Sequence, residues 1–334
     1  MPARRSMSER VHAGQPALAF GPVPSRRLGR SLGVNNIPPK RCTYSCIYCQ
    51  VGATRGTEAE RSTLRSPRDV LAAVDRTLTA CRERSEPVDF ITFVPDGEPT
   101  LDAHLGQEVR ALGALGPPVA VITNASLLWR EDVRADVAAA EVVSLKIDTV
   151  DERVWRRLNR PTSELRLAQV LGGIVEFART YAGRLLTETM LVADVNDDPA
   201  GVGRVAEFIA GIAPVCAYLA VPTRPPAVQT AVPPPPEVVV QAFRLMARRL
   251  PRVELLVGEE EGRFGRTGNP TEDLLGILAV HPMREERARA YLRDAGTAPG
   301  VLDRLLADGR VITASHGGHL FVMRPLRRSR EDWA

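Results

Sequence analysis

Long apolar runs and a secretion signal are both absent from this sequence. No apolar segment approaches the ~20 residues that a membrane-spanning helix needs, so a helical membrane span is excluded. The N-terminus has no apolar signal-peptide core, so an exported chain is not indicated. We therefore expect a cytoplasmic protein, in a compartment whose reducing conditions keep thiols free.

Lysine is almost missing as well. Of the 44 Lys and Arg residues, only Lys40 and Lys146 are lysines. Arginine provides a permanent positive charge but cannot replace a lysine that must lose its proton or act as a nucleophile. Both remaining lysines are therefore candidates for a function. The cations are also unevenly distributed, because residues 1–41 carry seven arginines and Lys40 against the single acid Glu9. Such a basic arm is typical of an RNA partner or of a solvated tail.

Only five cysteines are present, and three of them lie within eight residues. Cys42, Cys46 and Cys49 form C-x3-C-x2-C, while Cys81 and Cys216 fall in apolar stretches and are predicted to be core residues. Structural zinc needs four protein ligands, and no fourth Cys or His lies near the triplet. Three thiolates instead suit a cubane iron–sulfur cluster in which one iron remains open to another ligand.

This motif, with Tyr48 as the aromatic residue before the last cysteine, resembles the signature of the radical S-adenosylmethionine (SAM) superfamily. The resemblance implies that Cys42, Cys46 and Cys49 hold a [4Fe–4S] cluster whose open iron binds the amino and carboxylate groups of SAM. It also implies that Tyr48 lies along the adenine. Residues 21–36 are similar to the wyosine tRNA-base synthases. That subgroup carries further upstream cysteines for a second cluster, and no cysteine precedes Cys42 here.

Apolar strands alternate with amphipathic helices about six times along the chain. This rhythm predicts a parallel α/β sheet covered by helices, either an open doubly wound sheet or an incomplete (βα) barrel. The family resemblance favours a six-unit partial (βα) barrel of radical SAM type. The expected strands cover residues 31–37, 88–94, 119–123, 142–147, 184–192 and 215–221.

The remainder of the chain divides into a connector and a small C-terminal unit. Residues 222–237 contain seven prolines and predict a stiff segment, followed by a helix and a strand. Three helices and a hairpin around Gly317-Gly318 are then expected, an order that resembles a winged helix. The third helix carries Asp303, Arg304 and Asp308, so it could serve docking or packing as readily as RNA contact. The predicted domains are a loose basic arm (1–20), the barrel (21–222), the connector (223–270), the winged-helix-like domain (271–325) and a tail (326–334).

Polar residues follow the predicted strands at their carboxyl ends, where parallel barrels gather their chemistry. The tetrapeptide 96–99 resembles the family's Gly-Gly-Glu-Pro element, which implies that Gly97, Glu98 and Pro99 hold the ammonium of SAM. Asp96 stands where the family has its first glycine, and an ordinary turn is the alternative interpretation. Asn124, at the end of the next strand, is a further candidate for cofactor binding.

One strand carries three polar residues on a single face. The period of two sends Ser144, Lys146 and Asp148 into the barrel interior, where they could bind the carboxylate or ribose of SAM. Lys146 could instead engage the substrate through its amine, or form a structural ion pair with Asp148. We predict a catalytic role for Lys146, Glu188 and Arg224, and each of these residues could also be structural.

The function that the resemblance implies is reductive cleavage of SAM. One electron from the cluster yields methionine and a 5′-deoxyadenosyl radical, which abstracts hydrogen from a substrate. An external donor of the flavodoxin or ferredoxin type is expected, because the chain has no flavin or NAD fingerprint. The substrate remains open between an RNA base and a peptide or small metabolite. A non-catalytic iron–sulfur or zinc-binding regulator is the alternative from another class.

Overall fold

A computed structural model describes residues 17–54, 56–258 and 262–325. Its main sheet has eight strands in the order β1-β2-β3-β4-β5-β6-β7-β8. The first pair is antiparallel, and every later pair of neighbours is parallel. The strands are β1 (Ala19–Ser25), β2 (Gly29–Val34), β3 (Phe90–Phe93), β4 (Val119–Thr123), β5 (Val142–Lys146), β6 (Arg184–Met190), β7 (Cys216–Ala220) and β8 (Val253–Leu256).

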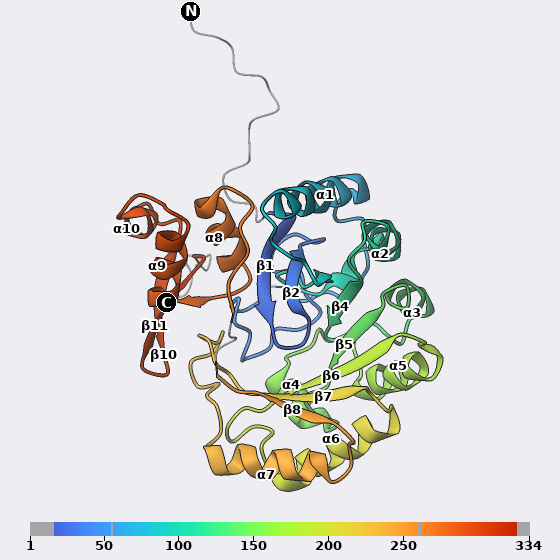
Figure 1. Cartoon of the computed structure of the whole chain (residues 1–334). Coiled ribbons are helices and arrows are strands. Elements are labelled where there is room, and N and C mark those ends of the chain that lie inside the picture. The colour runs from blue at the N-terminus through green and yellow to red at the C-terminus, as the bar shows by residue number, and fades with distance from the viewer. Residues whose placement is uncertain (1–16, 55, 259–261, 326–334) are drawn as a thin grey trace, which may run out of the picture.

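The six predicted parallel strands correspond to β2 through β7, and the sheet extends beyond them by one strand at each edge. β1 was not predicted, and it forms a hairpin with β2. β8 comes from the segment that the sequence indicated as a connector, and it pairs with β7. The curled sheet is therefore a half-barrel of eight strands (Figure 1).

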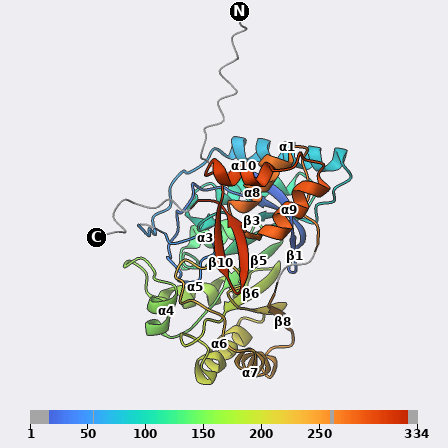
Figure 2. The same ribbon diagram turned by 90° about the vertical axis from the view of Figure 1, so that its left-hand side faces the viewer.

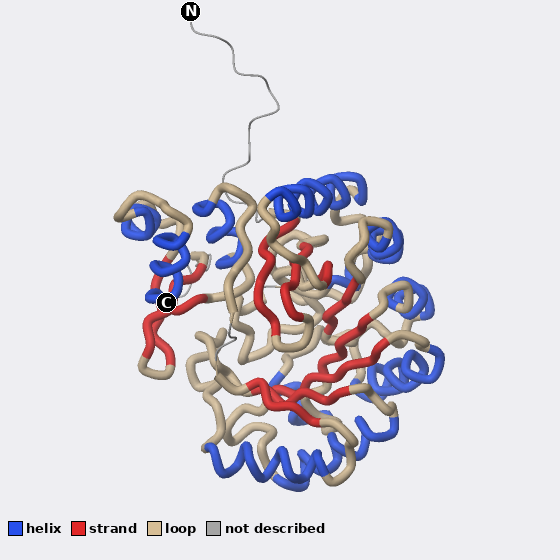
Figure 3. The backbone as a smooth tube through the Cα atoms, in the orientation of Figure 1, coloured by secondary structure: helices blue, strands red, loops and turns tan. Residues whose placement is uncertain are grey.

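Helices cover the outer, convex face of this sheet (Figures 1 and 3). In α1, the side chains Val70, Val74 and Leu78 are buried together with Cys81. Cys81 is 1% exposed and Cys216 in β7 is 2% exposed, which confirms both as core residues. The helices along the sheet are α1 (Pro67–Glu83), α2 (Leu105–Gly113), α3 (Glu131–Val137), α4 (Glu152–Leu158), α5 (Leu167–Thr180), α6 (Pro199–Gly211) and α7 (Pro236–Ala247), with a 3-10 turn, η2, at Pro99–Leu101.

The concave face changes from apolar to polar along the strands. Leu28, at the tip of the β1–β2 hairpin, packs in one apolar cluster with Val142 and Leu186. Because side chains alternate along a strand, Lys146 and Glu188 share the inward face of these two residues and lie nearer the carboxyl ends. The hairpin tip therefore fills one end of the half-barrel, and the polar residues gather at the other.

The C-terminal unit, residues 270–325, packs against the β1 edge of the sheet (Figure 2). Phe20 and Val23 of β1 belong to the same apolar core as Leu274 and Ile277 of this unit. Three helices and a hairpin form as predicted, and a short strand, β9, joins the hairpin in a sheet of order β10-β11-β9. Its elements are α8 (Pro270–Leu278), β9 (Met283–Arg284), α9 (Glu285–Asp294), α10 (Val301–Ala307), β10 (Ile312–His316) and β11 (His319–Met323).

Two of the predicted segments fall largely or wholly outside the described residues. Residues 1–16 of the expected basic arm and the tail from residue 326 are among them. Within the described part of the chain, no helix has both the length and the apolar character that a membrane crossing requires.

Candidate cofactor and active site

The three clustered cysteines occupy the loop after β2, and all three are free thiols of intermediate exposure. Two amide groups point at their sulfurs. Asn124 Nδ2 lies 3.6 Å from the Sγ of Cys42, and Asn159 Nδ2 lies 3.4 Å from the Sγ of Cys46. Burial and the charge of Asp148 raise the pKa of Cys46 to about 12, although the bond from Asn159 opposes them.

This set of donors fits an iron–sulfur cluster by its chemistry. Thiolates are the soft ligands that such clusters require, and N–H groups directed at their sulfurs tune cluster potentials. Over residues 17–54, 56–258 and 262–325, no group of three or more His, Cys, Asp or Glu side chains is arranged as a metal site. The observations that support a cluster are therefore the type of the three donor atoms and the amide groups directed at two of them.

The segment 97–99 lies directly beside the cysteine loop. Gly97 has φ +150°, and a Cβ at this position would lie 2.0 Å from the carbonyl oxygen of Arg41, so the close approach requires glycine. Glu98 N donates to that same oxygen at 2.9 Å. Arg41, which precedes Cys42, therefore forms a parallel β-bridge with Gly97 of the tetrapeptide.

The side chain of Glu98 holds this segment to the end of β4. Its Oε1 accepts from Thr100 Oγ1 at 2.7 Å and from Thr123 Oγ1 at 2.6 Å, and its Oε2 accepts from the backbone N–H of Asn124 at 2.8 Å. The carboxylate is only 1% exposed. The carbonyl oxygens of Glu98 and Pro99 also accept hydrogen bonds, from the N–H groups of Leu101 and Asp102, both at 3.2 Å.

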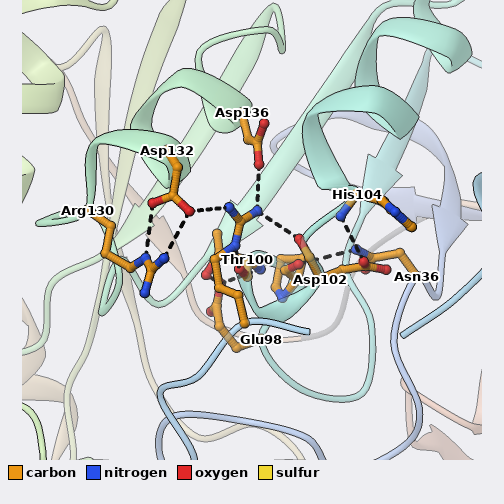
Figure 4. Close-up of polar contacts among 10 residues, drawn as sticks. Asn36, Glu98, Thr100, Asp102, His104, Arg130, Asp132 and Asp136 are labelled. Atoms are coloured by element: carbon orange, nitrogen blue, oxygen red, sulfur yellow. Dashed lines mark hydrogen bonds and ion pairs between the residues drawn. The ribbon is translucent and has the colours of Figure 1, made fainter. Parts of the chain in front are cut away.

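Arg61 fixes the same segment from the other side, and the sequence did not indicate it. Its guanidinium donates to the carbonyl oxygens of Thr100 (2.9 Å) and Asp102 (2.8 Å). It also donates to the carboxylates of Asp132 (2.8 Å) and Asp136 (2.5 Å) in α3. The Arg61 side chain is 7% exposed. In Figure 4, Asp132 and Asp136 of α3 lie above Thr100 and Asp102. The guanidinium of Arg61 bonds to all four of these residues and so links the tetrapeptide region to α3.

Lys146 and Glu188 meet inside the barrel. Lys146 forms an ion pair with Glu188, which also pairs with Arg27 from the hairpin tip. The alternative that paired Lys146 with Asp148 is therefore wrong, because β5 and β6 place Lys146 directly opposite Glu188. Burial alone would raise the pKa of Glu188, but Arg27 and Lys146 lower it to about 2. Ser144 completes this group, since its Oγ lies 3.4 Å from Arg27 Nη1.

Asp148 serves a different group of partners. It accepts hydrogen bonds from the hydroxyl of Tyr48, from Asn159 Nδ2 at 2.8 Å and from the backbone N–H of Met190 at 2.9 Å. Tyr48 is thereby fixed, and its ring centroid lies 5.0 Å from Lys146 Nζ. A cavity of about 20 Å³ borders Lys146, Asp148 and Asn159, which is enough for roughly one or two water molecules.

Arg224 follows β7 and lies toward the C-terminal unit. Its Nη1 donates to Gln50 Oε1 at 2.9 Å, and its Nη2 lies 3.1 Å from Nε2 of His281. Its charge also helps to lower the pKa of Glu188. Arg224 is therefore close to the Lys146–Glu188 pair while it bonds to Gln50 and His281.

The structure thus brings the candidate residues into neighbouring groups at one end of the half-barrel. The sequence missed Arg27, Arg61 and Asn159. Arg27 lies in the stretch 21–36 that resembles the wyosine synthases, which was a usable signal. Arg61 and Asn159 belong to no motif, and only the folded chain shows their contacts.

Comparison with known proteins identifies the family. A model described as the radical SAM superfamily matches residues 36–198. A UPF0026 protein of Methanocaldococcus jannaschii is 40% identical over 312 residues, which cover 93% of this chain and 97% of the relative. Two solved structures are also similar. SuiB of Streptococcus suis bound to S-adenosylmethionine has a TM-score of 0.48 and 14% identity, covering 68% of this chain and 52% of that chain. An archaeal TYW1 has a TM-score of 0.46 and 14% identity, covering 71% and 77%.

Radical SAM proteins are enzymes that use a [4Fe–4S] cluster and SAM and need a reductant as electron donor. These are the cofactors that the sequence predicted. The chain belongs to the UPF0026 family, and its residues 36–198 form a radical SAM superfamily domain.

Proposed function

We propose that this chain is a radical SAM enzyme in which Cys42, Cys46 and Cys49 hold the cluster. The observation that carries the proposal is the pair of amide groups from Asn124 and Asn159 at two of the three sulfurs. When bound, the cluster and SAM supply reductive cleavage of SAM to methionine and a 5′-deoxyadenosyl radical that abstracts hydrogen. The chain's own residues bind, orient and shield the reactants.

The cofactor site that we propose follows from the contacts around the cysteine loop. Gly97, Glu98 and Pro99 form the segment beside the cysteine loop that meets the ammonium of SAM. The carbonyl oxygen of Gly97 is the acceptor that we propose, because the side chain of Glu98 and the carbonyl oxygens of Glu98 and Pro99 already accept hydrogen bonds within the chain. The remaining candidates for contact with SAM, which lie on the strand ends and loops around the cysteines, are Tyr48, Asn124, Ser144, Lys146 and Asp148. The ring of Tyr48, held by Asp148, provides a fixed surface for the adenine.

The catalytic group that we propose is Lys146, Glu188 and Arg224. Burial would lower the pKa of Lys146, but Glu188 and Asp148 raise it overall. A lysine that acts as a nucleophile needs a lowered pKa, so this environment favours a charged Lys146 that donates hydrogen bonds to SAM or substrate. Glu188, held between Arg27 and Lys146, keeps its negative charge and orients both cations.

The substrate that we propose is an RNA base, with a peptide or small metabolite as the alternative. The stretch 21–36, whose Arg27 reaches the active site, supports the first. The C-terminal unit gives RNA little additional support, because Asp303 of α10 is paired with Arg289 of α9. A non-catalytic regulator is disfavoured, because the polar groups converge on the carboxyl ends of the strands as they do in barrel enzymes.

Anaerobic reconstitution with iron and sulfide, followed by reaction with SAM and dithionite, tests the proposal. We expect 5′-deoxyadenosine from the wild-type protein and none from Cys42→Ala, which should also lose iron. Cys216→Ala is the matched control, because it removes a thiol from the core of the sheet and should retain iron and product. Absence of 5′-deoxyadenosine from iron-loaded wild-type protein would refute the enzyme and favour the regulator.

A further inference from the structure

One carboxyl group of α2 is buried without a partner. Glu108 lies in the first turn of this helix and is 1% exposed. Within the described ranges 17–54, 56–258 and 262–325, neither of its carboxyl oxygens has a hydrogen-bond partner. An isolated carboxylate is strongly destabilised away from water, and such a group usually becomes neutral by binding a proton. Glu108 is therefore a candidate for a carboxyl group that stays neutral at physiological pH.

Two other buried polar atoms close to Glu108 also have no hydrogen-bond partner within the described part of the chain. They are Oδ1 of Asn36, between β2 and the cysteine loop, and Oδ2 of Asp102, directly after η2. Both side chains are 0% exposed. In the same part of the chain, no group of three or more acidic residues, cysteines or histidines is arranged as a metal site. A proton is therefore a simpler way than a metal ion to satisfy these atoms.

The surroundings of Glu108 favour its protonated form. Burial raises the pKa of Glu108 to about 8, the charge of Asp102 also raises it, and the polar side chain of Asn36 acts in the opposite direction. Two carboxylates in one dry site resist ionising together, so the pair holds one proton at neutral pH. Asp102 is the better place for the negative charge, because its Oδ1 accepts from the backbone N–H of His104 at 2.9 Å. The proton is therefore assigned to Glu108.

The other charged groups around α2 do not reverse this preference. Every acidic or basic residue of α1, which packs on α2, is exposed. The charged groups on the remaining elements around α2 are Arg61, Arg65, His104, Asp132 and Asp136. Arg61 is paired with both of these aspartates. Among the described charged groups, Asp102 is the one whose charge acts on the pKa of Glu108.

Asn36 connects this carboxyl group to the tetrapeptide beside the cysteine loop. Its Nδ2 donates to the carbonyl oxygen of Pro99 at 3.2 Å, and that oxygen also accepts from the N–H of Asp102 at 3.2 Å. An asparagine amide has a second N–H to donate and an oxygen that can accept an O–H. A protonated Glu108 supplies that O–H, whereas an ionised Glu108 leaves Oδ1 of Asn36 without a donor. The proton therefore supports the amide that holds Pro99.

We propose that Glu108 keeps its proton at neutral pH and donates it to Oδ1 of Asn36, so that Glu108 is a positioning residue for the SAM-binding segment. The effect reaches that segment through Asn36 and the carbonyl oxygen of Pro99. The role toward SAM rests on the proposed function. The proton on Glu108 does not, because it requires neither iron nor SAM.

Carbon-13 NMR of the full chain, labelled at the glutamate Cδ, tests the protonation directly. One glutamate signal of the wild-type protein should titrate with a midpoint near pH 8, and Glu108→Gln should remove that signal. The wild-type spectrum decides the question even if the variant does not fold. The absence of any glutamate signal that titrates above pH 7 would overturn the proposal.

Urea unfolding between pH 4.5 and 9 provides a second readout. The pKa of Glu108 in the folded chain lies above its ordinary value of 4.5, so the wild type should lose stability as the pH rises from 4.5 to about 8 and lose no more above it. Glu108→Gln is neutral throughout and should gain on the wild type across this range. The control is Glu131→Gln, at the exposed start of α3, which should follow the wild type. A gap between the wild type and Glu108→Gln that does not change with pH would contradict a proton on Glu108.

SAM affinity of the iron-reconstituted protein tests the positioning role. At pH 6.5 the wild type and Glu108→Gln should bind SAM within about threefold of each other, and at pH 9 the wild type should bind about tenfold or more weakly than the variant, because it has lost the proton. Comparison at equal pH cancels the titration of SAM itself. An equal ratio at both pH values would refute the positioning role. If neither protein binds SAM while the NMR signal titrates near pH 8, the proposed function fails and the proton on Glu108 stands.

Discussion

Arg324, which follows the last strand of the C-terminal unit, forms an ion pair with Asp96, which precedes Gly97 beside the cysteine loop. Asp96 is 2% exposed, and its other oxygen lies 3.3 Å from Lys40 Nζ. Lys40 also donates to the carbonyl oxygen of Gly52 at 2.6 Å, so it joins the two ends of the cysteine loop. The residue that departs from the family's Gly-Gly-Glu-Pro element therefore connects that loop to the C-terminal unit.

We predict that this ion pair couples the C-terminal unit to the cysteine loop. Asp96→Asn should lower the free energy of unfolding by roughly 2–3 kcal/mol, less than a fully buried pair costs, because Lys40 and Arg324 remain about a fifth exposed. Arg324→Gln should destabilise similarly, and the double variant should cost less than the sum. Urea unfolding and limited proteolysis near residue 270 provide the measurements.

The control for this cycle is the exposed pair of Arg30 and Asp89, whose side chains are 48% and 39% exposed. Arg30→Gln should change the free energy of unfolding much less than Asp96→Asn does, because solvent screens an exposed ion pair. Strictly additive effects of Asp96→Asn and Arg324→Gln would show that the two residues are not coupled.

The parts of the fold that the sequence predicted are those governed by local pattern. Each strand from β2 to β7 is a short apolar run followed by a helix, so its existence could be predicted without knowledge of its neighbours. β1 contains glycine and two prolines and is extended because it pairs with β2. β8 follows a proline-rich segment, and its membership of the sheet depends on pairing with β7. β1 was therefore missed as a strand, and β8, which was predicted as a strand of the connector, was missed as a member of the main sheet, because tertiary pairing decides both.

The same distinction applies within the candidate site. A period of two correctly sent Ser144 and Lys146 to one face of β5, and that face points into the barrel. The partner of Lys146 depends on the register between β5 and β6, which sets it opposite Glu188. Sequence spacing contains no information on that register. Arg27 reaches Glu188 across 161 positions of the chain, a contact that no local pattern could predict.

Arg61 is predicted to position the SAM-binding segment without touching the cluster. Arg61→Gln should weaken SAM binding about tenfold or more and leave the iron content of reconstituted protein unchanged, because its bonds to Thr100 and Asp102 shape residues 97–102. The matched control is Arg130→Gln, which loses two bonds to Asp132 at a site 34% exposed. Calorimetric SAM affinity is the decisive measurement, and equal affinity in the two variants would assign Arg61 to stability alone.

Substitutions of Lys146 can distinguish a role of its positive charge from a role of its amine as a reactive group. Because Glu188 and Asp148 keep its ammonium charged against the effect of burial, Lys146→Arg should retain 5′-deoxyadenosine formation within about tenfold of the wild type. Lys146→Met removes the positive charge but leaves the ion pair of Glu188 with Arg27 in place, and it should lower 5′-deoxyadenosine formation at least a further tenfold. Complete loss of product in the arginine variant, with normal iron content, would show instead that the amine itself is required.

The ion pairs of Glu188 should make the free energy of unfolding depend on pH. Its pKa in the folded chain is lowered from 4.5 to about 2, since Arg27 and Lys146 outweigh the effect of burial. The ion pairs therefore contribute stability that is fully present above about pH 4.5 and is lost as the pH falls toward 2, by up to roughly 3 kcal/mol.

Urea unfolding of the wild type and Glu188→Gln at pH 7, 5, 4 and 3 tests this. The variant should be less stable at pH 7, and the gap should narrow steadily below pH 4.5. Glu176→Gln, in an exposed pair with Arg179 on α5, should follow the wild type throughout. A gap between the wild type and Glu188→Gln that stays constant down to pH 3 would mean that the Glu188 carboxylate gains nothing from its two cations.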